Sequence, residues 1–244
     1  MSSAGNLAAW LLDGALASGA GPRTALRQGN RAWTYDELAS AVARTSAALR
    51  GLRLQRGERV LVLMRDTLEA AASILGAIHA GAIAVPVSEL STPDDVQEYV
   101  LHAGATIAIT DVHHEVVLDA VRNNTPDLRE VICVGARLAG SQDFQSLIDA
   151  AQPMPPERSG ASDVCLLLYS AGSGPGELRA VPHSKKTIEA GCCAERSLTR
   201  DAAGWRRSCS RSKERPFSCT MTISPSSTAR SGSWARSGSS SSGK

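Results

Sequence analysis

The sequence predicts an α/β fold in which helices cover both faces of a largely parallel sheet. Apolar runs of four to seven residues alternate with helical segments of ten to seventeen residues, an order typical of strand–helix–strand crossover units. The apolar runs are continuous rather than alternating, as expected for strands buried on both faces. The chain of 244 residues is long enough to bury a sizeable core, and no internal repeat divides it.

The predicted elements follow from periodicity and capping signals. A first helix carries Leu7 and Trp10 on one face, and a second begins at Thr34, which has capping-box spacing to Glu37. A later helix has Pro93 at its first position. We expect strands at 59–64, 82–87, 105–110, 130–135 and 163–169, helices between them at 65–81, 92–102 and 114–124, and a surface excursion over 135–162.

The net charge of +2 sums two unlike parts of the chain. Residues 205–244 hold eight Lys or Arg and one acidic residue, whereas the rest of the chain is mildly acidic and does not suggest nucleic acid as a partner. The six cysteines form no disulfide framework or zinc-site spacing, which predicts a reducing, cytoplasmic setting. No run approaches the roughly 18 apolar residues that a membrane span needs.

The pattern of buried elements ends near residue 200. Residues 205–244 contain fourteen serines and neither leucine, valine nor aspartate, so they cannot bury enough apolar surface to offset their ordering entropy. We expect residues 196–244 to form a disordered Ser/Arg-rich tail. A change of reading frame in the gene is the favoured origin of this tail, and a basic segment that binds RNA or acidic lipid is the alternative.

The stretch LLLYSAGSGPGELRAVPHS joins a buried run to a loop of small residues. At the end of a parallel strand such a loop lies at the carboxyl edge of the sheet, where ligands bind in open α/β folds. Its glycines can bring backbone N–H groups close to phosphate oxygens, while Ser170 and Ser173 add hydroxyl donors and Arg179 adds a positive charge. The loop has neither the Walker pattern nor dinucleotide-type glycine spacing. The residues alone therefore favour a phosphate loop and a flexible surface turn equally.

The same stretch resembles the phosphate-loop signature of the adenylate-forming superfamily, which includes acyl-CoA synthetases and other AMP-binding enzymes. The usual form of that signature is Tyr-Ser-Ser-Gly-Ser-Thr-Gly-x-Pro-Lys-Gly-Val, followed closely by His. The segments WTYDELASAVARTSAALRGL and GERVLVLMRDTLEAAASILGAIHAGAIAVPV are also similar to the family, and NLAAWLLD looks most like the benzoate–CoA ligase branch. The resemblance implies that residues 1–195 form part of a ligase N-terminal domain built on a parallel sheet.

The resemblance implies a two-step ligase acting on a carboxylic acid, with an aryl acid favoured. The carboxylate attacks the α-phosphate of ATP bound with Mg²⁺, giving an acyl-adenylate and pyrophosphate, and coenzyme A then takes the acyl group. The loop would hold the β- and γ-phosphates of ATP. The residues that match the phosphate-loop motif are Ser170, Ala171, Gly172, Ser173, Gly174, Pro175, Gly176 and Arg179.

The chain also departs from the family pattern. Gly174 stands where the family has threonine, Arg179 stands where it has lysine, and the loop is one residue longer. The resemblance covers about residues 5–195, without the segments that bind adenine, ribose and Mg²⁺ or the domain with the catalytic lysine. We therefore expect a truncated acid–CoA ligase that is inactive as this chain and has no catalytic or metal-binding residues of its own. The alternative is a non-catalytic nucleotide- or partner-binding module with a basic RNA-binding tail.

Four further residues have plainer structural interpretations. His79 lies late in an apolar helical segment and is expected to pack in the core. His113 and His114 open a helix, where we expect both to be solvated. Tyr169 ends a strand and is expected to pack there, although its hydroxyl is within reach of the loop.

Overall fold

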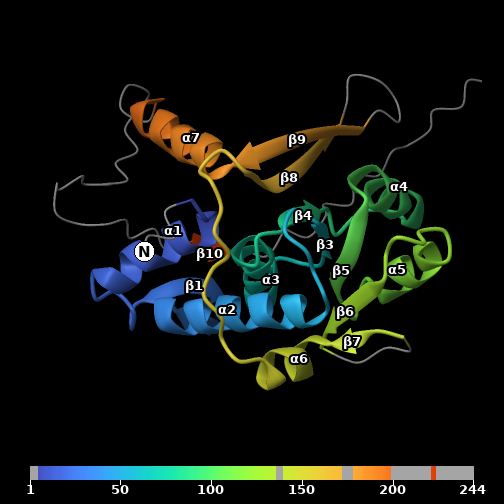
Figure 1. Cartoon of the computed structure of the whole chain (residues 1–244), viewed down its shortest axis with the longest axis horizontal. Helices are drawn as coiled ribbons and strands as arrows, with labels where there is room; N and C mark the ends of the chain where they lie inside the picture. Colours follow the sequence, from blue (N-terminus) through green and yellow to red (C-terminus); the bar gives the residue numbers. More distant parts are fainter. Residues whose placement is uncertain (1–4, 136–139, 172–177, 199–220, 224–244) are drawn as a thin grey trace, which may run out of the picture.

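The computed structural model describes residues 5–135, 140–171, 178–198 and 221–223 (Figure 1). Its main sheet is parallel except for one antiparallel hairpin at its end, which confirms the predicted α/β fold with a largely parallel sheet. In spatial order the strands are β7 (Gln142–Asp143), β6 (Glu130–Val134), β5 (Ala105–Asp111), β3 (Arg59–Leu63), β4 (Ile83–Val87), β8 (Val164–Ala171) and β9 (Leu178–Ser184).

Helices cover both faces of this sheet, and the sheet separates the core into two parts (Figure 1). Val60 and Val62 of β3 point into one core, whereas Leu61 and Leu63 point into the other, because successive side chains of a strand face opposite ways. The first core is closed by α1 (Leu7–Ala17), α2 (Tyr35–Gly51), α3 (Leu68–His79) and α6 (Phe144–Ala150), and the second by α4 (Pro93–Ala103) and α5 (Glu115–Arg122).

The helices begin where the capping signals predict. The Thr34 hydroxyl accepts from the Glu37 N–H, and the Glu37 carboxylate accepts from the Thr34 N–H in return. Thr92 and Asp95 make the same capping box at the start of α4. Hydrogen bonds from the backbone and hydroxyl of Thr34 lower the pKa of Glu37, and those from Thr92 lower the pKa of Asp95. Each box satisfies N–H groups that a helix leaves without partners.

Asn6 joins three distant parts of the chain. Its side-chain oxygen accepts from the N–H groups of Ala8 and Ala9 at the start of α1. Its side-chain nitrogen donates to the Ile78 carbonyl oxygen at 2.9 Å and to the Glu157 carbonyl oxygen at 3.2 Å. Asn6 is buried, so these contacts satisfy polar atoms that water cannot reach.

A second, smaller sheet has the order β10 (Met221–Ile223), β1 (Thr24–Gln28) and β2 (Arg31–Thr34). The hairpin β1–β2 turns at Gly29, whose φ of +56° suits glycine. Residues 221–223, which lie within the predicted tail, form β10, and this strand pairs parallel with β1. The edge of β1 that faces away from β2 presents backbone N–H and C=O groups, and a strand as short as β10 can pair with them. The rest of the predicted tail after Leu198 lies outside the described residues.

The expected surface excursion over residues 135–162 is wrong in part, because this stretch contains β7 and α6. Phe144 and Ile148 of α6 are buried in the first core, and the Asp143 carboxylate caps the helix by accepting from the Ser146 N–H. This helix has seven residues and only two buried positions, which are too few to reveal a helical period in the sequence.

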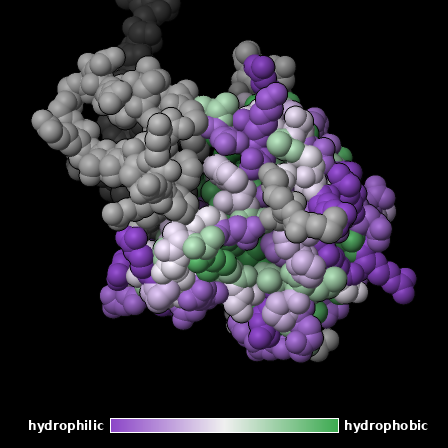
Figure 2. Space-filling model, turned by 60° about the vertical axis from the view of Figure 1, so that its left-hand side comes forward, coloured by the Kyte–Doolittle hydropathy of each residue, from purple (hydrophilic) through white to green (hydrophobic). Residues whose placement is uncertain are grey.

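The described surface mixes polar and apolar side chains. Figure 2 shows hydrophobic surface near the middle of one face, surrounded by hydrophilic residues. In β8, Val164 and Leu168 are 42% and 38% exposed, unlike the fully covered strands at the centre of the sheet. Among the helices that the structure describes, none is both long and apolar enough to cross a membrane.

Candidate functional site

The predicted phosphate loop joins β8 to β9. Because β8 runs parallel to β4, the loop leaves from the carboxyl end of a sheet strand, as the sequence predicts. Of the eight predicted binding residues, Ser170 and Ala171 end β8 and Arg179 lies in β9. The other five fall outside the described residues: Gly172, Ser173, Gly174, Pro175 and Gly176.

The structure brings two of the predicted binding residues together. Ser170 and Arg179 are direct register partners across the antiparallel β8–β9 pair, and Ala171 is the partner of Leu178 at the mouth of the loop. Both Ser170 and Arg179 are exposed. A hydroxyl and a guanidinium therefore stand side by side where the chain leaves the sheet, and both are donors suited to phosphate oxygens.

Tyr169 anchors the strand end next to the loop. Its Oη lies 2.8 Å from Nδ1 of His102 in a hydrogen bond, and its ring centroid is 4.8 Å from that of Tyr99. Both partners belong to α4. Burial raises the pKa of Tyr169, and electrostatic interactions with the neighbouring Tyr99 and Glu98 add to this effect. The expected packing of Tyr169 is confirmed, with its hydroxyl bonded to α4.

On the other side of the loop, β9 leads directly into α7 (Lys185–Leu198). The Ser184 N–H donates to Oγ1 of Thr187, and the Thr187 N–H donates to Oγ of Ser184, which caps the helix. Lys185 lies over the ring of Trp10, 5.2 Å from its centroid, and so ties α7 to α1. Burial raises the pKa of Cys165 in β8 to about 11, so this thiol is protonated at neutral pH.

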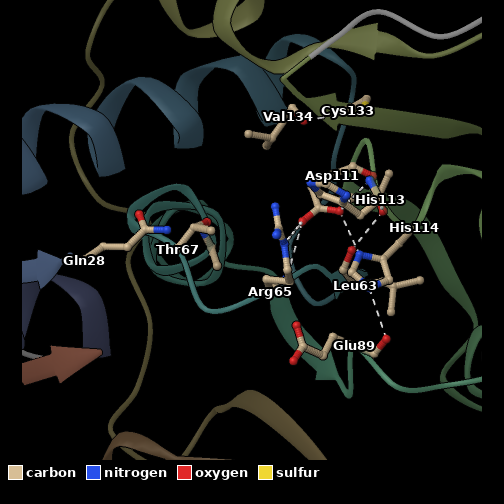
Figure 3. Close-up of polar contacts among 12 residues, drawn as sticks. Gln28, Leu63, Arg65, Thr67, Glu89, Asp111, His113, His114, Cys133 and Val134 are labelled. Carbon is tan, nitrogen blue, oxygen red and sulfur yellow. Dashed lines mark hydrogen bonds and ion pairs between the residues drawn. The ribbon is translucent and has the colours of Figure 1, made fainter. Parts of the chain in front are cut away.

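A second polar cluster lies at the carboxyl edge, between the ends of β3 and β5 (Figure 3). Oδ1 of Asp111 lies 2.7 Å from Nδ1 of His114 and accepts from the His113 N–H at 3.0 Å. Its Oδ2 accepts from Nε of Arg65 at 3.4 Å, while Nε2 of His114 lies 3.0 Å from the Glu89 carbonyl oxygen.

The buried carboxylate of Asp111 organises this cluster. Burial acts to raise the pKa of Asp111, but hydrogen bonds from His114 and from the His113 and Arg65 backbone, with the charge of His114, outweigh it and lower the pKa. The expectation that His114 is solvated is wrong, because its side chain is only 12% exposed. The signal that sequence reasoning missed is an Asp at a strand end followed by His three positions later.

The opposite, amino edge of the sheet holds a pocket of about 390 Å³. Arg56 and Asp163 form an ion pair of 2.7 Å in its lining, and hydrogen bonds from the Gly160 backbone and Arg56 lower the pKa of Asp163. Open α/β folds bind ligands at the other edge, so this pocket is a weaker candidate. Among the described residues, no group of three or more His, Cys, Asp or Glu is placed to hold a metal ion.

His79, at the end of α3, is packed as expected. It is buried, and its Nδ1 has no hydrogen-bond partner. Burial lowers the pKa of His79 to about 4, with a smaller contribution from the positive charge of Arg50. The ring is therefore neutral at physiological pH and belongs to the core.

Comparison with known proteins agrees with the fold and with the predicted family. The chain is 31% identical over 181 residues to the 3-hydroxybenzoate–CoA ligase of Aromatoleum sp. (strain CIB), an alignment that covers 73% of this chain and 34% of the relative. It is 30% identical to the benzoate–CoA ligase of Thauera aromatica, over 69% and 32% of the two chains. A crystal structure of an anthranilate CoA ligase in complex with anthranoyl-AMP matches with a TM-score of 0.71 and 26% identity, over 76% and 37%.

The chain spans about a third of the length of these curated relatives. The family model described as AMP-binding enzyme matches residues 15–211, beyond the boundary expected at 195. The match thus covers most of the chain, including β8, β9 and the loop between them. The chain belongs to the AMP-binding enzyme family, and its predicted resemblance to the benzoate–CoA ligase branch is confirmed.

Proposed function

We propose that this chain is the nucleotide-binding part of an aryl acid–CoA ligase, and that the turn from Ser170 to Arg179 holds the β- and γ-phosphates of ATP. The observation that carries this proposal is the register pair of Ser170 and Arg179 at the carboxyl end of β8. An exposed hydroxyl beside an exposed guanidinium suits a polyanion. The family membership and the names of the relatives support ATP, coenzyme A and an aryl acid as substrates.

In the proposed chemistry, a carboxylate oxygen of the acid attacks the α-phosphorus of ATP. The bond from that phosphorus to the bridging oxygen breaks, and pyrophosphate leaves. The thiolate of coenzyme A then attacks the acyl carbon of the adenylate, and AMP leaves. Ser170 and Arg179 act by orienting the departing pyrophosphate and neutralising its charge, which is the principal work of such sites. Mg²⁺ would accompany the triphosphate as its counter-ion.

We further propose that this chain alone binds ATP without completing adenylation. It spans about a third of the length of the curated ligases, so most of what those enzymes supply is outside it. In addition, Arg179 stands at the position of the family's lysine. Replacing a compact ammonium group by a broad guanidinium fork is not a conservative change. The proposed role is therefore nucleotide retention, with turnover expected only together with the ligase segments that this sequence does not span.

The test is equilibrium binding of ATP, ADP and AMP in the presence of Mg²⁺, measured by calorimetry. ATP and ADP are expected to bind more tightly than AMP, since AMP lacks the phosphates that the turn would hold. Arg179→Ala is expected to weaken ATP binding by about tenfold or more, the typical contribution of a hydrogen bond to a charged group. Lys186→Ala removes an exposed cation just beyond the other end of β9, away from the turn, and is the control.

Two results would count against this proposal. Equal ATP affinity in the wild type and in Arg179→Ala would show that Arg179 does not contact the phosphates of ATP. Pyrophosphate release with benzoate or 3-hydroxybenzoate, abolished by Arg179→Ala, would retain the phosphate site but overturn the claim that the chain does not complete adenylation.

A further inference from the structure

The pocket at the amino edge of the sheet lies between two strands that are only weakly joined. β4 is paired with β3 along its whole length, whereas the described part of β8 is paired with β4 at one point, Ala84 with Leu166. The lining of the pocket includes Ile83, just before Ala84, and Val164 and Cys165, just before Leu166. The pocket therefore lies where β4 and β8 separate, on the amino side of their register pair.

Each wall of the pocket is held by its own hydrogen bonds. Before β3 and β4, the Gly57 N–H donates to the Gly81 carbonyl oxygen at 2.9 Å, which joins the two segments that lead into these strands. In β8, Cys165 lies at a register shift of the β8–β9 pair, and its thiol donates to the His183 carbonyl oxygen at 3.6 Å. One wall thus belongs to the centre of the sheet and the other to the hairpin.

The pocket has an apolar floor and a charged rim. Ile78 and Ala82 are buried in its lining and supply aliphatic surface. Arg56, before β3, and Asp163, before β8, form their ion pair of 2.7 Å across the two walls, with side chains that are 58% and 45% exposed. Next to Arg56, a Cβ built on Gly57 would meet no other atom within 4 Å, so this stretch of bare backbone borders open space.

These features select for one kind of small molecule. An aromatic ring is flat enough to lie against the bare backbone of Gly57 and apolar enough for the floor. At the rim, a carboxylate would be repelled by Asp163 and an ammonium group by Arg56, whereas a carboxamide fits both, because its oxygen accepts from the guanidinium and its N–H groups donate to the carboxylate. The volume of about 390 Å³ falls within the range of roughly 300–1,000 Å³ that is common for such ligands.

We propose that this pocket binds a small aromatic molecule with a carboxamide end, and that the bound molecule joins β8 to β4. Its ring packs on Ile78 and Val164, and its amide pairs with Arg56 and Asp163. Because the ligand needs both walls in place, it stabilises the arrangement in which β4 and β8 are together and opposes opening of the β8–β9 hairpin. The pocket lies at the opposite edge from the candidate phosphate site, so ATP binding is a separate question.

The test uses 2-naphthamide and its acid, 2-naphthoate, which match in shape and differ in charge. Each is titrated into the full chain while the backbone amide NMR signals of Gly57, Gly81 and Cys165 are followed. The amide is expected to shift these signals and to bind about tenfold or more tightly than the acid, since the acid leaves a charged group without its hydrogen bonds. Absence of binding at millimolar amide, or binding that leaves these signals in place, would overturn the proposal.

Three variants make the test specific. Val164→Phe is expected to fill the pocket and abolish these shifts, whereas Leu168→Phe, the same enlargement at another exposed position of β8, lies outside the lining and should leave the affinity unchanged. Asp163→Asn keeps an oxygen that can accept from the Gly160 N–H but removes the negative charge, so naphthoate should then bind at least as tightly as naphthamide. Equal effects of the two Phe variants, or an unchanged preference for the amide in Asp163→Asn, would contradict the assignment.

Hydrogen exchange tests the joining of the two strands. With naphthamide at about ten times its Kd, exchange of the Leu166 and Leu167 amides should slow by about tenfold, because only the form with both walls in place binds. Val164→Phe should lose this slowing. Exchange in β8 that does not change while the pocket is occupied would overturn the claim that the ligand joins β8 to β4.

Discussion

β3 is paired in register with both β4 and β5 along its length, whereas β8 is paired with β4 only at Ala84 and Leu166. The centre of the sheet is held by neighbouring strands and by a core on each face. The β8–β9 hairpin is held mainly by its own antiparallel pairing, by the Tyr169 cluster on α4 and by the cap of α7. The candidate phosphate site therefore lies on the part of the main sheet with the weaker strand connection.

The largest contrast is expected from truncating apolar side chains in the two regions. Leu61 of β3 is fully buried, so Leu61→Ala should lower the free energy of unfolding by about 2–5 kcal/mol. Leu168 of β8 is 38% exposed, and Leu168→Ala should cost less than about 1 kcal/mol. Chemical denaturation followed by circular dichroism measures both values. Equal losses would mean that the hairpin is as firmly packed as the centre.

Acid is expected to weaken the central region through His79. The unfolded chain protonates this ring near pH 6.5, whereas the folded chain does so only near pH 4, because burial lowers its pKa to about 4. The stability that the neutral ring contributes is fully present above about pH 6.5 and is lost as the pH falls towards 4. The loss should be on the order of 2–3 kcal/mol.

Urea unfolding at a series of pH values from 4 to 7.5 measures this effect. His79→Leu should flatten the slope between pH 6.5 and 4, and His113→Gln, a change at an exposed histidine, should leave it in place. An unchanged slope in His79→Leu would assign the acid sensitivity to other groups.

The smallest predicted effect concerns the hydrogen bond between Tyr169 and His102. Tyr169→Phe keeps the ring packed on Tyr99 but removes the hydroxyl, and should cost about 0.5–1 kcal/mol. Because β8 is only loosely joined to β4, amide exchange should accelerate in β8 and β9 but not in β3 and β5. Acceleration spread evenly over the whole sheet would show that the two regions open as one unit.

The parts of the fold that sequence reasoning predicted are those with strong local signals. Continuous apolar runs identify β3 to β6 and β8, and the Thr34–Glu37 and Pro93 signals place the starts of two helices. β1 and β2 were missed because they are short and partly exposed, so they carry neither a continuous nor an alternating pattern. β9 was missed because Pro182 argues against a strand, although proline is tolerated at the edge position that β9 occupies.

The candidate site was predictable to a smaller extent. Small residues after a buried strand located the loop, and Arg179 was found by its place in the motif. That Ser170 and Arg179 are partners depends on β9 turning back, which the motif does not encode. The contact of His114 with the Glu89 carbonyl oxygen joins residues 25 positions apart in the sequence. Contacts of this kind arise from the topology of the sheet rather than from any local pattern.

The hydrogen bonds of Asn6 bear on the order in which the chain can fold. Asn6 contacts residues 72 and 151 positions further along the sequence. The helix that it caps leaves the ribosome well before residue 157, so its polar anchor stays incomplete until residue 157 has been synthesised. Bringing Asn6 and residue 157 together costs conformational entropy before the contacts between them can offset that cost. The beginning of this chain is thus among the last parts that can settle into place.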